Sequence, residues 1–400
     1  RTISGTVTHD TIPISGAVVY AFDASQQYLE TTTNSDGWFA FDATPDDWLR
    51  ILVITPITSN AIPSYYPQQA EYCAAERIDG RIDQSLDIQL DTGIQATVTL
   101  TDTFDPSGIL LMAQPESGLM RGGWADENGT VWLGGLPPDT DITLSMEGDG
   151  IPDQWVSGLD TTTYSSDESR LLNVDDIDGL NISVREGITI SGLVHHGSTP
   201  IPDARVSVYS NSQIRNTTTN DDGFYTIQGL PTGEVLAWMS ADGYANTYSP
   251  NDDRPTTFVP VETEGMTYDL LDMNAPLEST ISVTLLDALT EEPIQGASVL
   301  LYNDTRTVGR GEPVNDNGTA TIRGLHAGQY QAYFYAKNDG YSNGYVLDEV
   351  GEPLWIEVES ESDVEFQAYL EPKYDALIEI MDDFGNPGRS VRDGGRRGSK

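Results

Sequence analysis

A turn block recurs four times along this chain of 400 residues and constrains its fold more than any other feature. An acidic or amide residue followed by glycine stands at Asp36-Gly37, Asn128-Gly129, Asp222-Gly223 and Asn317-Gly318. The four glycines are 92, 94 and 95 residues apart. Such pairs supply the positive-φ positions of tight turns that lead into strands. A spacing this regular indicates tandem copies of one structural unit.

Three of the copies share a second mark, a Gly-Leu pair that follows the turn. The marks are Gly135-Leu136-Pro137, Gly229-Leu230-Pro231 and Gly324-Leu325-His326. The first copy reads Ala43-Thr44-Pro45 at this place and matches less well.

Each copy opens and closes with a segment in which apolar and polar residues alternate. The opening segments are residues 3–7, 94–98, 190–194 and 281–285, and the closing segments are residues 86–90, 180–184, 268–273 and 364–370. This period predicts β-strands with one buried face, and frequent turn signals between them are typical of an antiparallel sandwich. We therefore predict an all-β chain of four tandem, Ig-like or transthyretin-like antiparallel β-sandwiches. Their predicted ranges are residues 1–93, 94–187, 188–278 and 279–372, joined by short linkers into a stiff rod.

The repeated motifs carry a family resemblance. The series Ile-Ser-Gly-x-Val, Pro-x-x-Gly-Ala-x-Val, Thr-Asn-x-Asp-Gly-aromatic and Gly-Leu-Pro-x-Gly resembles the carboxypeptidase regulatory-like domain. The match is good over residues 1–90 and 188–273, fair over 281–370 and weak over 94–184. The resemblance implies a seven-stranded, transthyretin-like sandwich, similar in shape to the Cna-B-like repeat domains of Gram-positive adhesins. It also implies an extracellular module with no catalytic residue.

The charge balance excludes several classes of partner. The chain has 20 basic against 63 acidic side chains, a net charge of −43. Nucleic acid needs clustered Lys and Arg, so it is excluded as the main partner, and direct adsorption to an anionic membrane is disfavoured. No apolar run is long enough for a membrane helix, so we expect no direct membrane insertion. A first residue of Arg rather than Met is compatible with removal of a signal peptide, and we expect a secreted, extracellular or cell-surface protein.

The sequence offers little for catalysis. Its histidines are His9, His195, His196 and His326, and no hydrolase or metalloprotease signature accompanies them. The one cysteine, Cys73, excludes a disulfide framework. We expect it to be a semi-buried free thiol, with an intermolecular disulfide as the alternative. We predict that the chain is not an enzyme and requires no cofactor.

Calcium is the one metal ion for which the sequence offers candidate binding residues. Carboxylates alternate with glycine at Glu147, Asp149 and Asp153, in a run that resembles thrombospondin type 3 calcium loops, and a second acidic run holds Asp175, Asp176 and Asp178. Such oxygen donors suit a hard cation. The alternative for both runs is a solvated acidic loop.

Two surface features fit an extracellular setting. Five N-x-Ser/Thr sequons stand at Asn128, Asn181, Asn216, Asn303 and Asn317 as candidate glycosylation sites. Aromatic residues recur 25–29 residues past each turn glycine, at Tyr65-Tyr66, Trp155, Tyr248 and Tyr345, and Tyr244 and Tyr341 shortly precede the last two. They suit a plug at one end of each sandwich, and the alternatives are stacking against a bound glycan or a contact between successive sandwiches.

The last 28 residues, 373–400, read as an orphan strand and a basic tail. Residues 376–381 repeat the pattern of an opening strand, with Leu377, Ile378, Ile380 and Met381 as its apolar members. One strand cannot bury its apolar face alone, so it completes another subunit's sheet, begins a fifth domain, or packs against the fourth sandwich. The tail holds five cations that could bind the acidic body of another copy: Arg389, Arg392, Arg396, Arg397 and Lys400.

Together these features predict a non-enzymatic structural protein of an extracellular filament or cell surface. In this prediction the protein partners itself and assembles head to tail by donating its C-terminal strand. The alternatives are a stalk or adhesin that binds a glycan or protein partner, and an accessory region of a larger secreted enzyme.

Overall fold

The computed structural model describes residues 1–42, 48–101, 105–158, 160–249, 258–269, 271–303, 310–336, 340–348 and 350–372. These residues form strands and three single-turn 3₁₀ helices, η1 (Tyr72–Ala74), η2 (Ser166–Glu168) and η3 (Val174–Asp176), and they contain no α-helix. The all-β prediction is therefore confirmed. Within these same ranges, no helix has the length and apolar character that a membrane span requires. The predicted assembly strand at 376–381 and the basic tail at 389–400 lie outside the described residues.

The strands form eight sheets, which face one another in four pairs. In sandwich 1 one sheet holds β1 (Thr2–His9), β2 (Ile12–Pro13), β5 (Trp38–Asp42) and β9 (Gln84–Leu90), and the other holds β3 (Val18–Phe22), β4 (Tyr28–Thr32), β6 (Trp48–Ile54), β7 (Ser64–Tyr65) and β8 (Ile78–Asp79). In sandwich 2 the sheets hold β10 (Ile94–Thr101), β13 (Thr130–Leu136) and β18 (Leu180–Ser183), and β11 (Leu110–Pro115), β12 (Arg121–Trp124), β14 (Asp141–Glu147), β15 (Gln154–Val156), β16 (Thr162–Thr163) and β17 (Leu172–Asn173).

Sandwiches 3 and 4 repeat this arrangement. In sandwich 3 the sheets hold β19 (Ile188–His196), β20 (Thr199–Pro200), β23 (Phe224–Leu230), β27 (Thr267–Asp269) and β28 (Met273–Asn274), and β21 (Arg205–Ser210), β22 (Gln213–Thr218), β24 (Gly233–Ser240), β25 (Thr247–Tyr248) and β26 (Val259–Val261). In sandwich 4 they hold β29 (Ser279–Asp287), β32 (Thr319–Leu325) and β36 (Asp363–Leu370), and β30 (Ala297–Asn303), β31 (Arg310–Pro313), β33 (Gly328–Ala336), β34 (Gly344–Tyr345) and β35 (Ile356–Val358).

Each pair of sheets encloses its own hydrophobic cluster. The alternating opening strands put every second side chain into it, as in β1, where Ile3 and Val7 are fully buried. The four clusters draw on residues 3–90, 96–184, 188–275 and 281–370, which lie within the four predicted ranges. Ile57 of sandwich 1 also packs against the cluster of sandwich 2, so sandwich 1 contacts the core of sandwich 2.

One pair of strands in each sandwich runs parallel, which the predicted antiparallel arrangement did not include. The opening strand lies beside the closing strand in parallel register in β1 with β9, β10 with β18, β19 with β27 and β28, and β29 with β36. The chain crosses to the second sheet between them and returns in the same direction, which a parallel pair requires.

The repeated turn docks onto the opening strand. In sandwich 3 the Asn220 Oδ1 accepts hydrogen bonds from the backbone N–H of Asp222 and of Phe224. Gly223 has φ of +77°, and a Cβ there would lie 2.5 Å from the Val194 carbonyl oxygen. Its own carbonyl accepts from the Val194 N–H at 2.9 Å. The same contacts recur around Asn34, Asp126 and Asn315.

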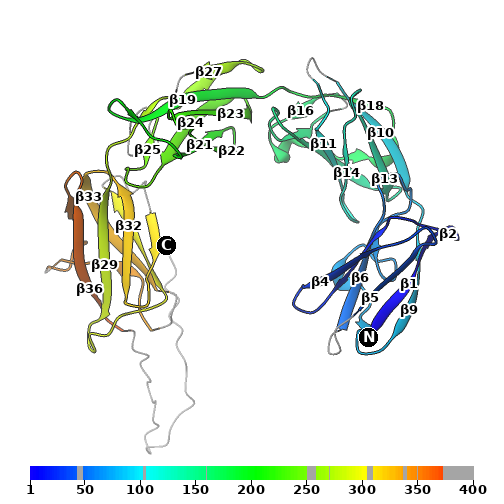
Figure 1. The fold of residues 1–400 in the computed structure, drawn as a ribbon, viewed down its shortest axis with the longest axis horizontal. Coiled ribbons are helices and arrows are strands. Elements are labelled where there is room, and N and C mark those ends of the chain that lie inside the picture. Colours follow the sequence, from blue (N-terminus) through cyan, green and yellow to red (C-terminus); the bar gives the residue numbers. More distant parts are fainter. Residues whose placement is uncertain are drawn as a thin grey trace, which may run out of the picture.

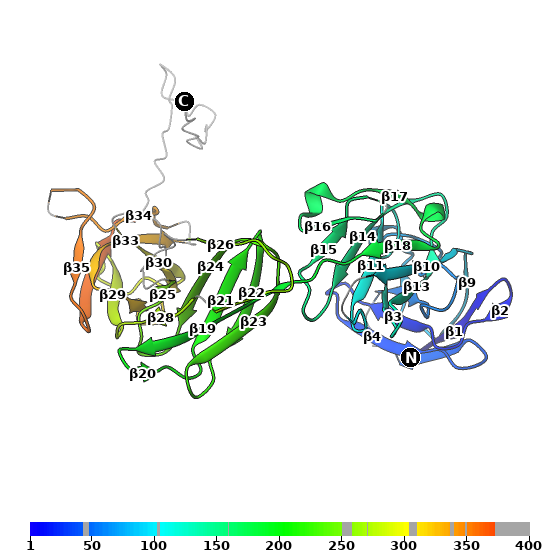
Figure 2. The same ribbon diagram turned by 90° about the horizontal axis from the view of Figure 1, so that it is seen from above.

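The four sandwiches follow one another along an arch, so the array is curved rather than a straight rod (Figure 1). Seen from above, sandwiches 1 and 2 form one half and sandwiches 3 and 4 the other (Figure 2). The separation and angle between the two ends of the array therefore depend on the contacts between successive sandwiches.

Candidate functional site at the junctions between sandwiches

Each junction joins two recurring elements. One is the exit loop, the segment that follows the last long strand of the second sheet: residues 60–63, 150–153 and 243–246. The other is the Gly-Leu corner of the next sandwich: Gly135-Leu136, Gly229-Leu230 and Gly324-Leu325. The exit loop also pairs with the linker, so the linker is fixed on both sides.

At the first junction the exit loop lies against glycine backbone. The Gly93 N–H donates to the Asn60 carbonyl at 2.7 Å, and the Ile62 N–H donates to the Asp91 carbonyl at 2.9 Å. Gly135 has φ of +72°, and a Cβ on it would lie 2.4 Å from the Ala61 carbonyl oxygen. Only glycine fits this corner, because both the backbone conformation and the approach of the loop exclude a side chain.

Arg121 binds the two sandwiches together at this junction. Its Nε donates to the Gly134 carbonyl at 2.7 Å within sandwich 2, and its Nη2 donates to the Thr55 and Pro56 carbonyls of sandwich 1 at 3.1 and 3.2 Å. The side chain is 5% exposed. Burial lowers the pKa of the guanidinium to about 10, because the charged form is the one that loses hydration.

The second junction repeats the glycine contact and adds side chains. The Gly187 N–H donates to the Gly150 carbonyl at 3.0 Å, and a Cβ on Gly229 would lie 2.8 Å from the Ile151 carbonyl oxygen. Gln213 of sandwich 3 accepts from the Asp153 N–H at 3.0 Å and donates to the Asp153 carbonyl at 2.7 Å. This reciprocal pair resembles one rung of a β-ladder.

An ion pair packed against an aromatic ring lies on the other side of the second junction. The Arg185 guanidinium lies 4.2 Å from the centre of the Tyr164 ring, and its Nε donates to Glu264 Oε1 at 2.6 Å. The Tyr164 hydroxyl donates to the same oxygen at 3.1 Å. Burial raises the pKa of Tyr164 above its ordinary value, so the hydroxyl remains a donor.

The third junction uses His326 in place of the proline. The Asn246 N–H donates to the Gly324 carbonyl at 3.0 Å, and His326 Nε2 lies 2.7 Å from the Asn246 carbonyl oxygen. Gly324 donates its own N–H to Glu278 Oε2 at 2.7 Å. A cavity of 640 Å³ opens beside these contacts, and Tyr244 and Arg323 line it. Of the recurring aromatics, Tyr244 therefore lies at a contact between sandwiches.

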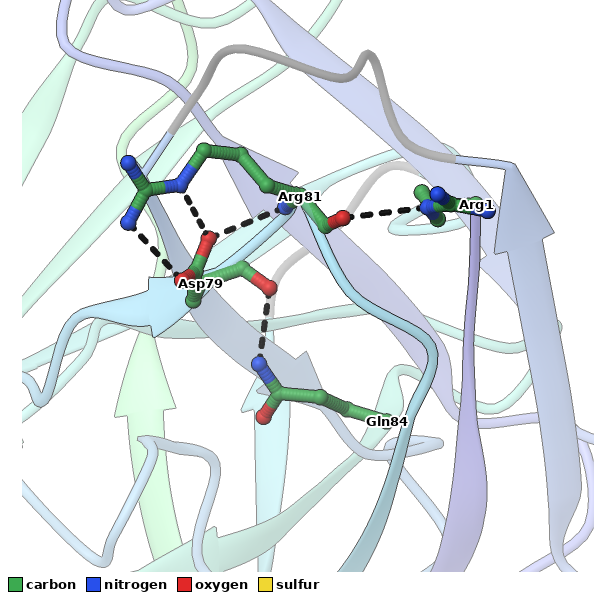
Figure 3. A network of polar contacts seen from close by, with 4 residues as sticks. All are labelled: Arg1, Asp79, Arg81 and Gln84. Atoms are coloured by element: carbon green, nitrogen blue, oxygen red, sulfur yellow. Dashed lines mark hydrogen bonds and ion pairs between the residues drawn. The ribbon is translucent and has the colours of Figure 1, made fainter.

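Sandwich 1 presents a different surface where sandwich 3 has the acceptor Glu264. The loop between β8 and β9 corresponds to the loop between β26 and β27 that holds Glu264. Here Arg81 pairs with Asp79 through both carboxylate oxygens at 2.7 and 2.8 Å, and Gln84 and Arg1 bond to the same loop (Figure 3). Hydrogen bonds from Arg81 lower the pKa of Asp79. The polar groups of this loop are satisfied within the sandwich.

The calcium candidates are spread over different contacts. Asp153 accepts from Arg215 Nη2 at 2.6 Å across the second junction, and Asp178 accepts from the Thr97 N–H at 2.9 Å. Glu147, Asp149, Asp175 and Asp176 are exposed. Over the part of the chain that the structure describes, no group of three or more His, Cys, Asp or Glu side chains could hold a metal ion. Calcium binding stays a prediction.

The remaining candidate residues have ordinary surface or structural positions. Four of the sequon residues are exposed: Asn128, Asn181, Asn216 and Asn317. Asn303 is 6% exposed and is the least accessible of the five, and glycosylation stays a prediction for all of them. Cys73 is a free, exposed thiol rather than the semi-buried one expected. His9, His195 and His196 each contact an oxygen of a neighbouring loop or linker, at Thr92, Gly197 and Ala275.

Sequence reasoning identified the Gly-Leu mark but not its partner. Arg121, Gln213 and Glu264 were harder still to identify from the sequence, because none of them has a counterpart at the equivalent position of another sandwich. Their partners come from the preceding sandwich, which a pattern within one copy does not reveal.

Several solved structures are similar to this chain. The TIE protein of Bacillus anthracis is 12% identical, and the match covers 90% of this chain and 69% of the TIE chain with a TM-score of 0.22. A streptococcal ancillary pilin is 11% identical, with coverage of 70% and 98% and a TM-score of 0.23. The minor pilin of Streptococcus agalactiae is 13% identical, with coverage of 48% and 99% and a TM-score of 0.24. Similarity at these scores says nothing about the function of this chain.

A search of curated proteins found no match. The family model of the carboxypeptidase regulatory-like domain matches residues 189–261, which confirms the predicted resemblance over most of sandwich 3.

Proposed function

We propose that this chain is a non-enzymatic structural spacer of an extracellular or cell-surface assembly, which holds the groups at its two ends at a fixed separation and angle. The observation that carries the proposal is the repeated junction. At all three, main-chain groups of an exit loop bond to the linker or the next sandwich, and at the first two the corner glycine lets the backbones meet closely. Domains that move freely on flexible linkers are not joined by buried contacts of this kind.

The charge of the chain supports the same function. A net charge of −43 keeps neighbouring sandwiches apart except where specific contacts join them, and it keeps the array soluble. A family match to a regulatory-like domain, which is a non-catalytic type, agrees with a structural role.

Small-angle X-ray scattering tests the spacer. The full chain is expected to scatter as one curved body of narrow size distribution. The matched control is a chain with about ten Gly and Ser residues inserted between Glu186 and Gly187, which frees the second junction. A distribution of sizes equally broad in both proteins would contradict the proposal.

Head-to-tail self-assembly is a second, finer function, favoured by the sequence after residue 372. An alternating strand at 376–381 can add to a neighbour's sheet, with main-chain hydrogen bonds giving affinity. The five cations between Arg389 and Lys400 oppose the sign of the acidic body and would steer the encounter. Electron microscopy of residues 1–400 beside 1–372 tests this version. Filaments from the long form alone support it, and single arches from both forms contradict it.

A further inference from the structure

The exit loop at the outer end of sandwich 4 exposes positions that are covered in the exit loop of sandwich 3. In sandwich 3 the residues 242–248 read Asp-Gly-Tyr-Ala-Asn-Thr-Tyr, and in sandwich 4 the residues 339–345 read Asp-Gly-Tyr-Ser-Asn-Gly-Tyr. Five of the seven positions are identical. The match extends to the backbone, since Tyr244 forms a bridge with Leu277, and Tyr341 forms the same bridge with Pro372. Residues 340–343 are therefore the fourth exit loop.

Burial separates this loop from its counterparts. Ala61, Ile151 and Ala245 in the first three exit loops are at most 1% exposed. In the fourth loop Ser342, at the position of Ala245, and Asn343, at the position of the half-buried Asn246, are exposed. The neighbouring loop after β34 also exposes two apolar side chains, with Leu347 56% and Val350 82% exposed. In sandwich 1 the loop after β7 lies at the equivalent place and contributes Gln68 and Ala70 to the first junction.

We infer that this end of sandwich 4 is a docking surface for a further β-sandwich that carries a Gly-Leu corner. The corner glycine would lie against Tyr341 with positive φ, and its carbonyl would accept the Asn343 N–H, as Gly324 accepts from Asn246. The occupant must present glycine here, because a Cβ on Gly135 or Gly229 at the existing junctions would meet the exit-loop carbonyl within 2.8 Å. The inference deepens the spacer function and rests on it.

The observations disfavour a second copy of this chain as the occupant. Its Gly135, Gly229 and Gly324 corners are already covered by its own exit loops. Its sandwich 1 reads Ala43-Thr44-Pro45 at the corner, and the β8–β9 loop bonds to itself through Asp79 and Arg81. Residues 376–381 repeat the sequence alternation of the opening strands, as expected where a new sandwich begins, and on this inference they are not donated to a second copy.

A chain extended by one sandwich tests the docking surface. In it, a second copy of residues 278–372 follows Pro372 directly, in place of residues 373–400. The copy of Gly324-Leu325 within it supplies a free Gly-Leu corner. Hydrogen exchange of backbone amides in the segment 340–346 is compared with that in the full natural chain. Because the Asn246 and Ala245 N–H groups are bonded at the third junction, we expect exchange in this segment to slow about tenfold in the extended chain.

A matched pair of substitutions localises the effect. Ser342→Arg is expected to leave the stability of the natural chain unchanged, since Ser342 is exposed, and to abolish the added protection in the extended chain. Unchanged exchange at 340–346, in an extended chain whose added copy of β32 is itself protected and therefore folded, would overturn the inference. Protection that rises with the concentration of the natural chain would also overturn it and assign the surface to a second copy. Neither result affects the scattering test of the three internal junctions, so failure of the docking surface and failure of the spacer remain distinguishable.

Discussion

The Arg121 guanidinium of sandwich 2, which is buried, donates a hydrogen bond to the Thr55 carbonyl of sandwich 1 at 3.1 Å. Among the described residues the partners of this buried cation are three carbonyls, so its position there depends on hydrogen-bond geometry rather than on a carboxylate. The first junction therefore depends on one side chain that satisfies three backbone acceptors at once.

Replacing Arg121 should uncouple the first junction. Arg121→Met keeps the apolar stem and removes the donors, which leaves the Gly134, Thr55 and Pro56 carbonyls without this partner. We expect the free energy of unfolding of the transition that includes sandwich 2 to fall by about 2–3 kcal/mol. Arg170→Met, at an exposed arginine of the same sandwich, is the matched control and should change it little. Chemical denaturation measures both, and equal effects would contradict the role of Arg121.

The pair of Tyr341 and Asp287 should make sandwich 4 sensitive to alkali. The Tyr341 hydroxyl donates to Asp287 Oδ2 at 2.6 Å, and this bond raises the pKa of Tyr341 to about 12. Because the folded pKa lies above the ordinary value of 10, the stabilisation is complete below pH 10 and is lost as the pH rises towards 12. Tyr341→Phe should flatten this part of the stability profile, measured by thermal unfolding between pH 9 and pH 12.

The same bond predicts an acid limb with the opposite sign. The Tyr341 hydroxyl and two backbone N–H groups hold the pKa of Asp287 below its ordinary value. Stability from this carboxylate is present above its ordinary pKa and is lost as the pH falls through the lowered one. Tyr341→Phe should weaken that loss too, whereas Tyr335→Phe, at an exposed tyrosine on β33, should leave both limbs unchanged. A profile identical in the Tyr341 variant and the parent would contradict the pairing.

The turns and the sandwiches could be predicted from the sequence, but the contacts between successive sandwiches could not. Alternation alone placed the opening strands and Asp-Gly or Asn-Gly placed the turns, because both depend on neighbours within a few residues. The residue that closes each turn, such as Asn220, lies three positions before the glycine; the Thr-Asn-x-Asp-Gly motif contained it but did not show that its side chain accepts two backbone N–H groups. The parallel pairing of β1 with β9 and the docking of Gly135 on Ala61 join residues more than 70 positions apart, so local periodicity carries no record of them.

Two glycines of sandwich 3 separate backbone strain from steric exclusion. Gly223 and Gly197 both have positive φ, at +77° and +60°. A Cβ on Gly223 would meet the Val194 carbonyl oxygen at 2.5 Å, whereas nothing lies within 4 Å of one on Gly197. Gly197→Ala should cost about 1 kcal/mol of unfolding free energy for the left-handed conformation alone, and Gly223→Ala about 3 kcal/mol because the opening strand must also move. Equal costs, measured by denaturant unfolding, would mean that the turn does not dock tightly on β19.

Asp153 distinguishes the calcium prediction from a structural role at the second junction. It accepts from Arg215 at 2.6 Å, whereas the exposed Asp149 belongs to the same acidic run without facing sandwich 3 in this way. If Asp153 acts through Arg215, Asp153→Ala should lower the free energy of unfolding by about 1 kcal/mol, equally in calcium and in chelator, and Asp149→Ala should change it little. If the run binds calcium, the parent should instead be stabilised by calcium, and both substitutions should remove that gain. Thermal unfolding of the parent and the two variants in each buffer decides between them, and because Asp153 already has a cation as partner, we expect the first result.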